Sequence, residues 1–233
     1  MGMTGTFTAL VMTATIFLGT HFAMSHPLRR PLVGALGEKM FLAVYSLVAL
    51  VTLGAMVWAY RAAPTTVPLW IVGDGLWATS TALMLIASIL LLGSFVRNPA
   101  LPGAGHTAAT ATAQGVYAVT RHPAMWAFAF WGVSHILIYP VAKNIILSGA
   151  IIVLALVGAA LQDRKKMGLD PHGWPAWEAR TSYLPFAAIG AGRAQFGRLG
   201  MHAIGGGVLI WLAATWAHIP LAGWPAGIWR WLV

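Results

Sequence analysis

Residues 123–162 read PAMWAFAFWGVSHILIYPVAKNIILSGAIIVLALVGAALQ and decide the fold of this chain. Around Lys143 the stretch divides into two apolar runs, 123–142 and 144–162. Each run has the length that an α-helix needs to cross a hydrocarbon core about 30 Å thick. Almost no sequence separates the runs, so they predict a tight antiparallel helical hairpin inside a membrane.

The same kind of run recurs along the rest of the chain. Four more stretches are long and apolar enough to cross a bilayer: 5–25, 41–60, 76–96 and 203–219. Hydrophobic residues make up 59% of the 233 residues and charged residues 8%, whereas about 25% of a soluble domain is charged. We therefore expect an all-α, polytopic transmembrane helical bundle of about six spans, forming one domain over residues 1–233.

The basic residues indicate how the bundle is oriented. Of the 14 Lys and Arg residues, those in the loops after the first, third and fifth spans greatly outnumber those on the other side. The minority are Arg61, Lys143 and Arg230. By the positive-inside rule the basic loops face the cytoplasm and both termini face outward, as in a multi-pass protein of the bacterial inner membrane. We read the net charge of +9 as contact with anionic membrane lipid, and expect no nucleic-acid partner.

Composition also limits the chemistry. The chain has no cysteine and only five carboxylates. These counts exclude a thiolate metal site and a cysteine nucleophile, and argue against a two-carboxylate hydrolase. A metal would have to be held by histidine.

Two histidines fall inside predicted spans. His21 lies about 12 Å into the membrane from Arg29, and His135 lies about 20 Å beyond His122, at 1.5 Å per residue. An ionisable side chain at such depth is a functional candidate. The other histidines, including His106, lie in loops or at span ends, and His218 is expected at the outer interface.

Around His135 the helical spacing gathers an aromatic face. Phe128, Trp131, Gly132 and Tyr139 are placed on the side of the helix that carries His135. This face would suit a flat apolar ring, and we predict a haem with His21 and His135 as its axial ligands. The basic residues that would meet its propionates are Arg29, Arg97 and Arg121. The alternative is that each histidine only bonds Ser or Thr on a neighbouring helix.

The segment Thr120-Arg121-His122-Pro123 opens the fourth span. Proline suits the first turn of a helix, because its missing N–H would be unpaired there anyway. Arg121 and His122 then present donors near a helix N-terminus, where a carboxylate or phosphate could bind. The alternative is an ordinary basic flank.

Three stretches together resemble the NnrU family of bacterial membrane proteins. They are THFAMSHPLRRPLVGALGEKMFLAVYSLVALVTLGAMVWAYRAAP, GVYAVTRHPAMWAFAFWGVSHIL and ARTSYLPFAAI, which follow in the same order as in the family. The resemblance implies a link with denitrification, through nitrite and nitric oxide reductases. The chain is also similar to the plant zeta-carotene isomerases, which implies a b-type haem and cis/trans isomerisation of a lipophilic polyene. His21 and His135 match the axial histidines of those enzymes, but Gly132 stands where they have a cysteine.

A more distant similarity is to the isoprenylcysteine carboxyl methyltransferases. Their RHPxYxG motif corresponds to RHPAMWA, with Met125 and Ala127 at the divergent positions, and Asp163-Arg164 replaces their paired glutamates. It implies, as an alternative, an S-adenosylmethionine-dependent membrane methyltransferase that uses Arg121 and His122. A non-enzymatic assembly partner is a third possibility.

Overall fold

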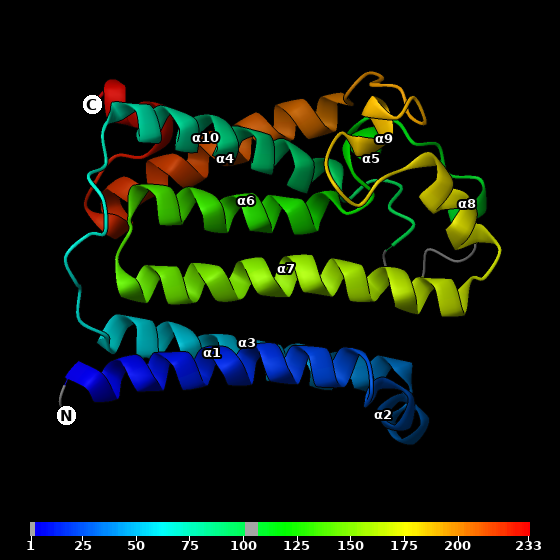
Figure 1. Cartoon of the computed structure of the whole chain (residues 1–233), viewed down its shortest axis with the longest axis horizontal. Coiled ribbons are helices and arrows are strands. Elements are labelled where there is room, and N and C mark those ends of the chain that lie inside the picture. Colours follow the sequence, from blue (N-terminus) through cyan, green and yellow to red (C-terminus); the bar gives the residue numbers. More distant parts are fainter. Residues whose placement is uncertain (1–2, 101–106) are drawn as a thin grey trace.

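The computed structural model describes residues 3–100 and 107–233, and these contain helices and no strand. His106 lies outside the described residues. The long helices run side by side (Figure 1). They are α1 (Met3–Ser25), α3 (Glu38–Ala62), α4 (Asp74–Gly93), α6 (Pro123–Ile138), α7 (Ala142–Leu169) and α10 (Met201–Ala222). All except α6 are long and apolar enough to cross a membrane, which confirms the all-α polytopic bundle.

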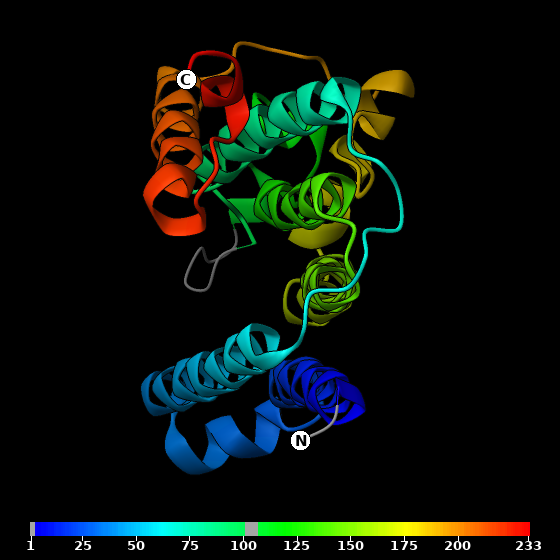
Figure 2. The same ribbon diagram turned by 90° about the vertical axis from the view of Figure 1, so that its left-hand side faces the viewer.

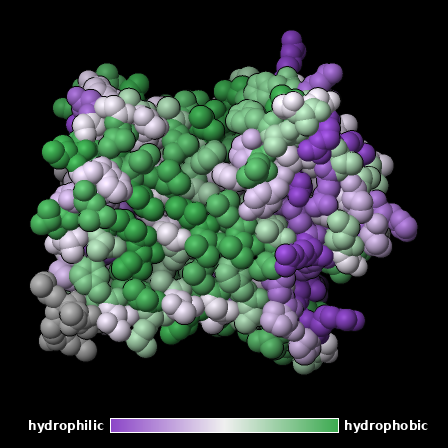
Figure 3. All heavy atoms as spheres, viewed as in Figure 1, coloured by the Kyte–Doolittle hydropathy of each residue, from purple (hydrophilic) through white to green (hydrophobic). Residues whose placement is uncertain are grey.

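Two helix boundaries differ from the predicted ones. Helix α6 ends at Ile138, because the backbone turns away at Tyr139 ahead of Pro140, and its 16 residues rise only about 24 Å. Helix α7 continues beyond the predicted residue 162 to Leu169. Its last turns carry Asp163 at the hydrophilic end of the bundle (Figures 1 and 3).

Both termini lie at one end of the bundle (Figure 1), as expected for an even number of crossings. The opposite end gathers the hydrophilic side chains (Figure 3) and the short helices. These are α2 (Arg29–Leu36), η1 (Thr107–Ala109), α5 (Val116–Val119), α8 (Gly173–Arg180) and α9 (Ala187–Gly190). Following the positive-inside rule, we call this the cytoplasmic end. The other end, the outer end, holds η2 (Gly227–Trp231).

The long helices form two groups that α7 joins. Helices α4, α6 and α10 pack together, α1 packs against α3, and α7 lies between the groups (Figure 2). Small residues allow the close approaches. A Cβ added at Gly207 of α10 would lie 2.7 Å from Cα of Ile89 on α4. Because the α1–α3 pair is attached to the rest chiefly through α7, helices α3 and α6 are left facing one another across a groove.

Candidate functional site

Three histidines of the long helices make the same local hydrogen bond. The Nδ1 atoms of His21, His135 and His218 each lie 2.8 Å from the carbonyl oxygen four residues earlier. A carbonyl can only accept, so the proton is on Nδ1 and the lone pair is on Nε2. The alternative prediction is a bond to Ser or Thr of a neighbouring helix, but these Nδ1 atoms bond the backbone of their own helices instead. Each ring is fixed by its own helix and presents a free acceptor.

The structure does not bring His21 and His135 together. The His21 ring lies beside Tyr45 of α3, with the centroids 5.6 Å apart, whereas His135 shares its cavity with Val57 of that helix. The stretch of α3 from Tyr45 to Val57 rises about 18 Å. In this arrangement one iron cannot be bonded by both imidazoles. The pairing of His21 with His135 around one haem stays a prediction that the geometry does not support.

The remaining residues predicted to hold the haem are dispersed as well. Arg29 bonds Glu38 at 2.6 Å, Arg97 lines a separate cytoplasmic cavity, and Arg121 bonds Asp163. No common site for two propionates results from these positions.

Gly132 has a structural role rather than the predicted one. A Cβ there would lie 2.6 Å from Ile152 Cγ1 and 2.9 Å from the carbonyl oxygen of Ser148, both on α7. The space that we expected a ring to fill is therefore filled by α7. Tyr139 packs against Trp224 of the C-terminal segment, with the ring centroids 5.7 Å apart.

Phe128 and Trp131, in contrast, line neighbouring, mostly apolar cavities. Two cavities of about 390 and 510 Å³ lie between the α1–α3 pair and helices α6 and α7, and they share Leu53, Phe128 and Ile151. We call them together the lipid groove. Its cytoplasmic half also contains Phe17, His21, Tyr45, Met125 and Leu154, and its outer half Val57, Tyr60, Trp131, His135 and Leu147. One of the predicted histidines thus stands toward each end.

The cytoplasmic end of the lipid groove is polar. Ser25, His26, Gln162 and Lys165 line it. The hydroxyl of Ser25 donates to the carbonyl oxygen of His21 at 2.6 Å, so at 2.8 Å it accepts from Nδ1 of His26. This leaves Nε2 of His26 as an acceptor, and it is buried without a partner among the described residues. A guest with a polar end would place that end here.

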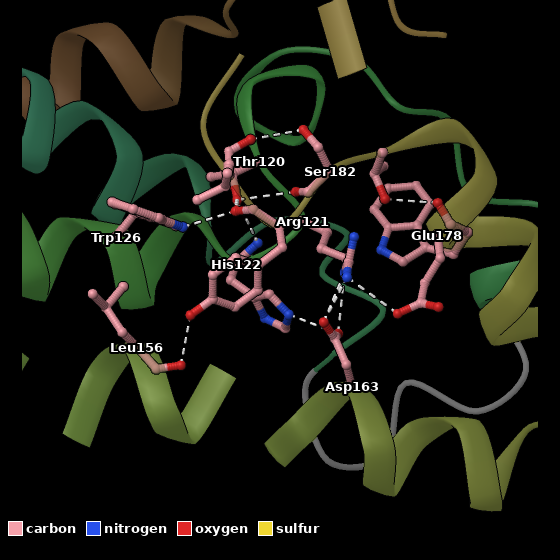
Figure 4. Close-up of polar contacts among 12 residues, drawn as sticks. Thr120, Arg121, His122, Trp126, Leu156, Asp163, Glu178 and Ser182 are labelled. Atoms are coloured by element: carbon pink, nitrogen blue, oxygen red, sulfur yellow. Dashed lines mark hydrogen bonds and ion pairs between the residues drawn. The ribbon is translucent and has the colours of Figure 1, made fainter. Parts of the chain in front are cut away.

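The TRHP segment forms an ion-pair cluster (Figure 4). Arg121 bonds Asp163 through Nε at 3.0 Å and Nη2 at 2.6 Å, and Nη2 also lies 3.1 Å from Glu178. Nε2 of His122 donates to Asp163 at 2.7 Å, and His122 is only 3% exposed. We call these four residues the Asp163 cluster. The donors that we assigned to an external anion are already used inside the protein.

Neighbouring bonds fix this segment further. Trp126 Nε1 and the Thr120 hydroxyl both donate to the carbonyl oxygen of Tyr183, each at 2.8 Å. The Tyr183 hydroxyl donates to the carbonyl oxygen of Leu156 at 2.6 Å. Burial and the nearby Asp163 charge raise the pKa of Tyr183, so its hydroxyl keeps the proton that it donates. The sequence showed Asp163 and Glu178 only as two of the rare carboxylates, with no sign of which cations they meet.

Comparison with known proteins gives one match. A model of the NnrU protein family matches residues 9–226, nearly the whole chain. The chain belongs to the NnrU family. No curated protein and no solved structure matches it. The matched range of this NnrU protein contains the lipid groove and the Asp163 cluster.

Proposed function

We propose that this NnrU protein takes an elongated apolar molecule of the polyene or isoprenoid class from the bilayer into the lipid groove. One observation carries the proposal: two mostly apolar cavities lie next to each other and share Leu53, Phe128 and Ile151 as lining residues. Ligand sites in proteins are mostly apolar concavities with a few polar groups that fix orientation. Here those groups are His26 and Lys165 at the cytoplasmic end, and Arg61 and Asn144 at the outer end.

The shape of the groove favours a long molecule over a compact one. It runs past both Tyr45 and Val57, positions about 18 Å apart along α3. Phe17, Phe128 and Trp131 supply aromatic surface, which packs well against a conjugated chain. Cis/trans isomerisation of a lipophilic polyene, the activity that the resemblance implied, is the reaction that suits such a site.

Haem b remains part of the proposal in a reduced form. His21 and His135 both line the groove, so either imidazole could supply one axial nitrogen, and bound haem would supply redox chemistry. A Soret band that stays with the detergent-purified protein through gel filtration would support this, and a colourless protein after haem addition would contradict it. A role in nitrite and nitric oxide metabolism, in the bacterial inner membrane, stays a proposal based on the resemblance.

A methyltransferase is a weaker proposal. It would need Arg121 and His122 to hold S-adenosylmethionine, but Asp163 and Glu178 already take their donors. A purely structural assembly partner would not need an apolar channel of this size, although such a role is compatible with the Asp163 cluster.

The groove can be tested by filling it. Ile151→Trp places an indole where the two cavities join, whereas Val153→Trp, on the same helix, enlarges an exposed side chain that lines neither cavity. Parinaric acid, a conjugated fatty acid whose fluorescence rises in apolar surroundings, serves as the probe. We expect Ile151→Trp to weaken saturable binding about tenfold or more, since overpacking costs about 1–3 kcal/mol.

The control decides how the result is read. Val153→Trp should bind the probe as the unaltered protein does, and both variants should elute as monodisperse peaks in gel filtration. Equal binding by the two variants would place the probe in the detergent rather than in the lipid groove, and would contradict the proposal.

A further inference from the structure

A second cavity borders the outer half of the lipid groove at Trp131 and His135 of α6, which line both spaces. Helices α4, α6 and α10 enclose a space of about 110 Å³ near the outer end, closed by the C-terminal segment. We call it the outer cavity. Its lining includes Thr81, Met84, His135, Trp211 and His218.

Two imidazoles meet in the outer cavity. The ring centroids of His135 on α6 and His218 on α10 are 6.3 Å apart, with the planes inclined by 35°. Both Nδ1 atoms donate to carbonyl oxygens of their own helices, so both Nε2 atoms are lone-pair acceptors. Two acceptors cannot satisfy one another. A cation or a hydrogen-bond donor between them would satisfy both.

Other groups of this cavity also have no partner among the described residues. Nε1 of Trp211 is buried and unbonded, in a side chain that is only 8% exposed, and the Thr81 hydroxyl is unbonded too. A buried donor left without a partner costs about 1–3 kcal/mol. The outer cavity is therefore suited to a polar or charged guest. Trp131 and His135 of α6 line both this cavity and the outer half of the lipid groove.

The donor types select the kind of guest. No group of three or more His, Cys, Asp or Glu suited to a metal ion occurs in the described part of the chain, which disfavours tetrahedral zinc. The outer cavity instead combines two imidazoles with the thioether of Met84. Imidazole binds copper well, and thioether sulfur selects copper(I) over harder ions.

The ring separation fits one shared ion. A metal bonds an imidazole nitrogen at about 2 Å, and the ring centroid lies roughly an ångström further away. Two rings on opposite sides of one ion are then about 6 Å apart, as observed here. The Nδ1-to-carbonyl bonds are the outer contacts that orient metal-binding histidines.

We infer that the outer cavity binds one copper(I) ion through Nε2 of His135 and Nε2 of His218, with the Met84 thioether as a third, softer donor. Trp211 Nε1 can donate to a water or an anion beside the ion. The C-terminal segment covers the site. A Cβ at Gly227, whose φ is +58°, would lie 2.7 Å from Thr215 Cγ2, and Arg230 lies over Trp77 at 4.7 Å. The inference does not rest on the proposed occupant of the lipid groove.

Competition with a coloured copper(I)–bicinchoninate complex tests the inference on the full-length, detergent-purified protein under anaerobic conditions. We expect the protein to remove about one copper per chain from the complex. His218→Ala, at a half-buried position outside the lipid groove, should weaken copper binding about 100-fold or more. Met84→Leu should weaken it about tenfold and keep the protein folded, since the two side chains have similar volume.

His21→Ala is the matched control, because His21 makes the same Nδ1-to-carbonyl bond but has no imidazole partner. It should bind copper(I) normally. The inference is wrong if the unaltered protein removes no copper from the complex, because ordered water is then the guest. It is also wrong if His218→Ala binds copper(I) as tightly as the unaltered protein, or if the protein binds zinc(II) more tightly than copper(I). Parinaric acid binding by His218→Ala should be unchanged, so failure of this site and failure of the lipid groove can be told apart.

Discussion

The Asp163 cluster and the outer cavity both place histidine among polar groups, but they differ in how far those groups are satisfied. In the Asp163 cluster, Arg121 and His122 face a carboxylate at hydrogen-bonding distance. In the outer cavity the ring centroids of His135 and His218 are 6.3 Å apart, and the Trp211 indole N–H has no partner among the described residues. Satisfied buried polar groups hold a fold together, whereas unsatisfied ones mark where something binds. The difference separates a structural histidine from a ligand-binding pair.

We expect the largest loss of stability when the carboxylate of Asp163, which Arg121 and His122 share, is removed. Asp163→Ala leaves the Arg121 guanidinium with only Glu178, in a largely buried setting. Loss of one partner from a buried ion pair costs about 3–5 kcal/mol. We expect a large drop in thermal stability in detergent, measured by the loss of the monodisperse peak in gel filtration after heating.

Asp74→Ala is the control for that loss. Asp74 also bonds an arginine, Arg230, at 3.0 Å, but its side chain is 79% exposed. An exposed pair contributes about 0–1 kcal/mol, so this variant should melt close to the unaltered protein. An equal loss in both variants would show that burial of the Asp163 cluster is not what stabilises this end of the bundle.

The contact between α6 and α7 tests whether the space beside His135 is filled. Gly132→Ala forces its new methyl group against Ile152 and the backbone of Ser148, so we expect a loss of about 1–3 kcal/mol. Gly149→Ala, on the facing helix, meets nothing within 4 Å and should be neutral or stabilising by up to about 1 kcal/mol. Thermal unfolding followed by circular dichroism measures both. A neutral Gly132→Ala would reopen the predicted slot for a flat ring.

The smallest expected effect is the difference between a hydrogen-bonded tryptophan of the Asp163 region and an unbonded tryptophan of the outer cavity. Trp126 Nε1 donates to Tyr183 at 2.8 Å, whereas Trp211 Nε1 has no partner among the described residues. Trp→Phe removes the indole N–H and part of the ring at both positions, so the loss of ring volume is matched between the two variants. We expect Trp126→Phe to lose about 1 kcal/mol more than Trp211→Phe, the typical net worth of a hydrogen bond.

Thermal unfolding in the absence of added metal is again the measurement. If Trp211→Phe destabilises the metal-free protein as much as Trp126→Phe does, the Trp211 N–H already has a hydrogen-bond partner. The unpaired indole would then no longer be evidence for a guest in the outer cavity. The same pair examined with copper(I) present should show the Trp211 variant gaining less stability from the ion.

The sequence alone determined the all-α polytopic bundle, the common side of the two termini (Figure 1) and the end that carries the basic loops, whereas only five of the six predicted spans are long and apolar enough to cross a membrane in the described residues. These features are local: a run of apolar residues crosses the bilayer wherever its neighbours lie, and flanking Lys and Arg set the direction. It also singled out His135, Phe128 and Trp131 as residues that face cavities. The ends of α6 and α7 were misplaced, because Pro140 shortens one helix and the other continues past the membrane as a polar helix.

Only the tertiary structure decided which residues meet. His135 lies beside His218, whereas His21 lies beside Tyr45. Asp163 bonds Arg121 and His122, and Gly132 allows the close approach of α7. The physical reason is that lipid and protein are equally apolar neighbours for a membrane helix, so hydrophobicity does not select a helix's partners. Small residues, side-chain shape and the few polar groups select them, and these act between positions that are far apart in the chain.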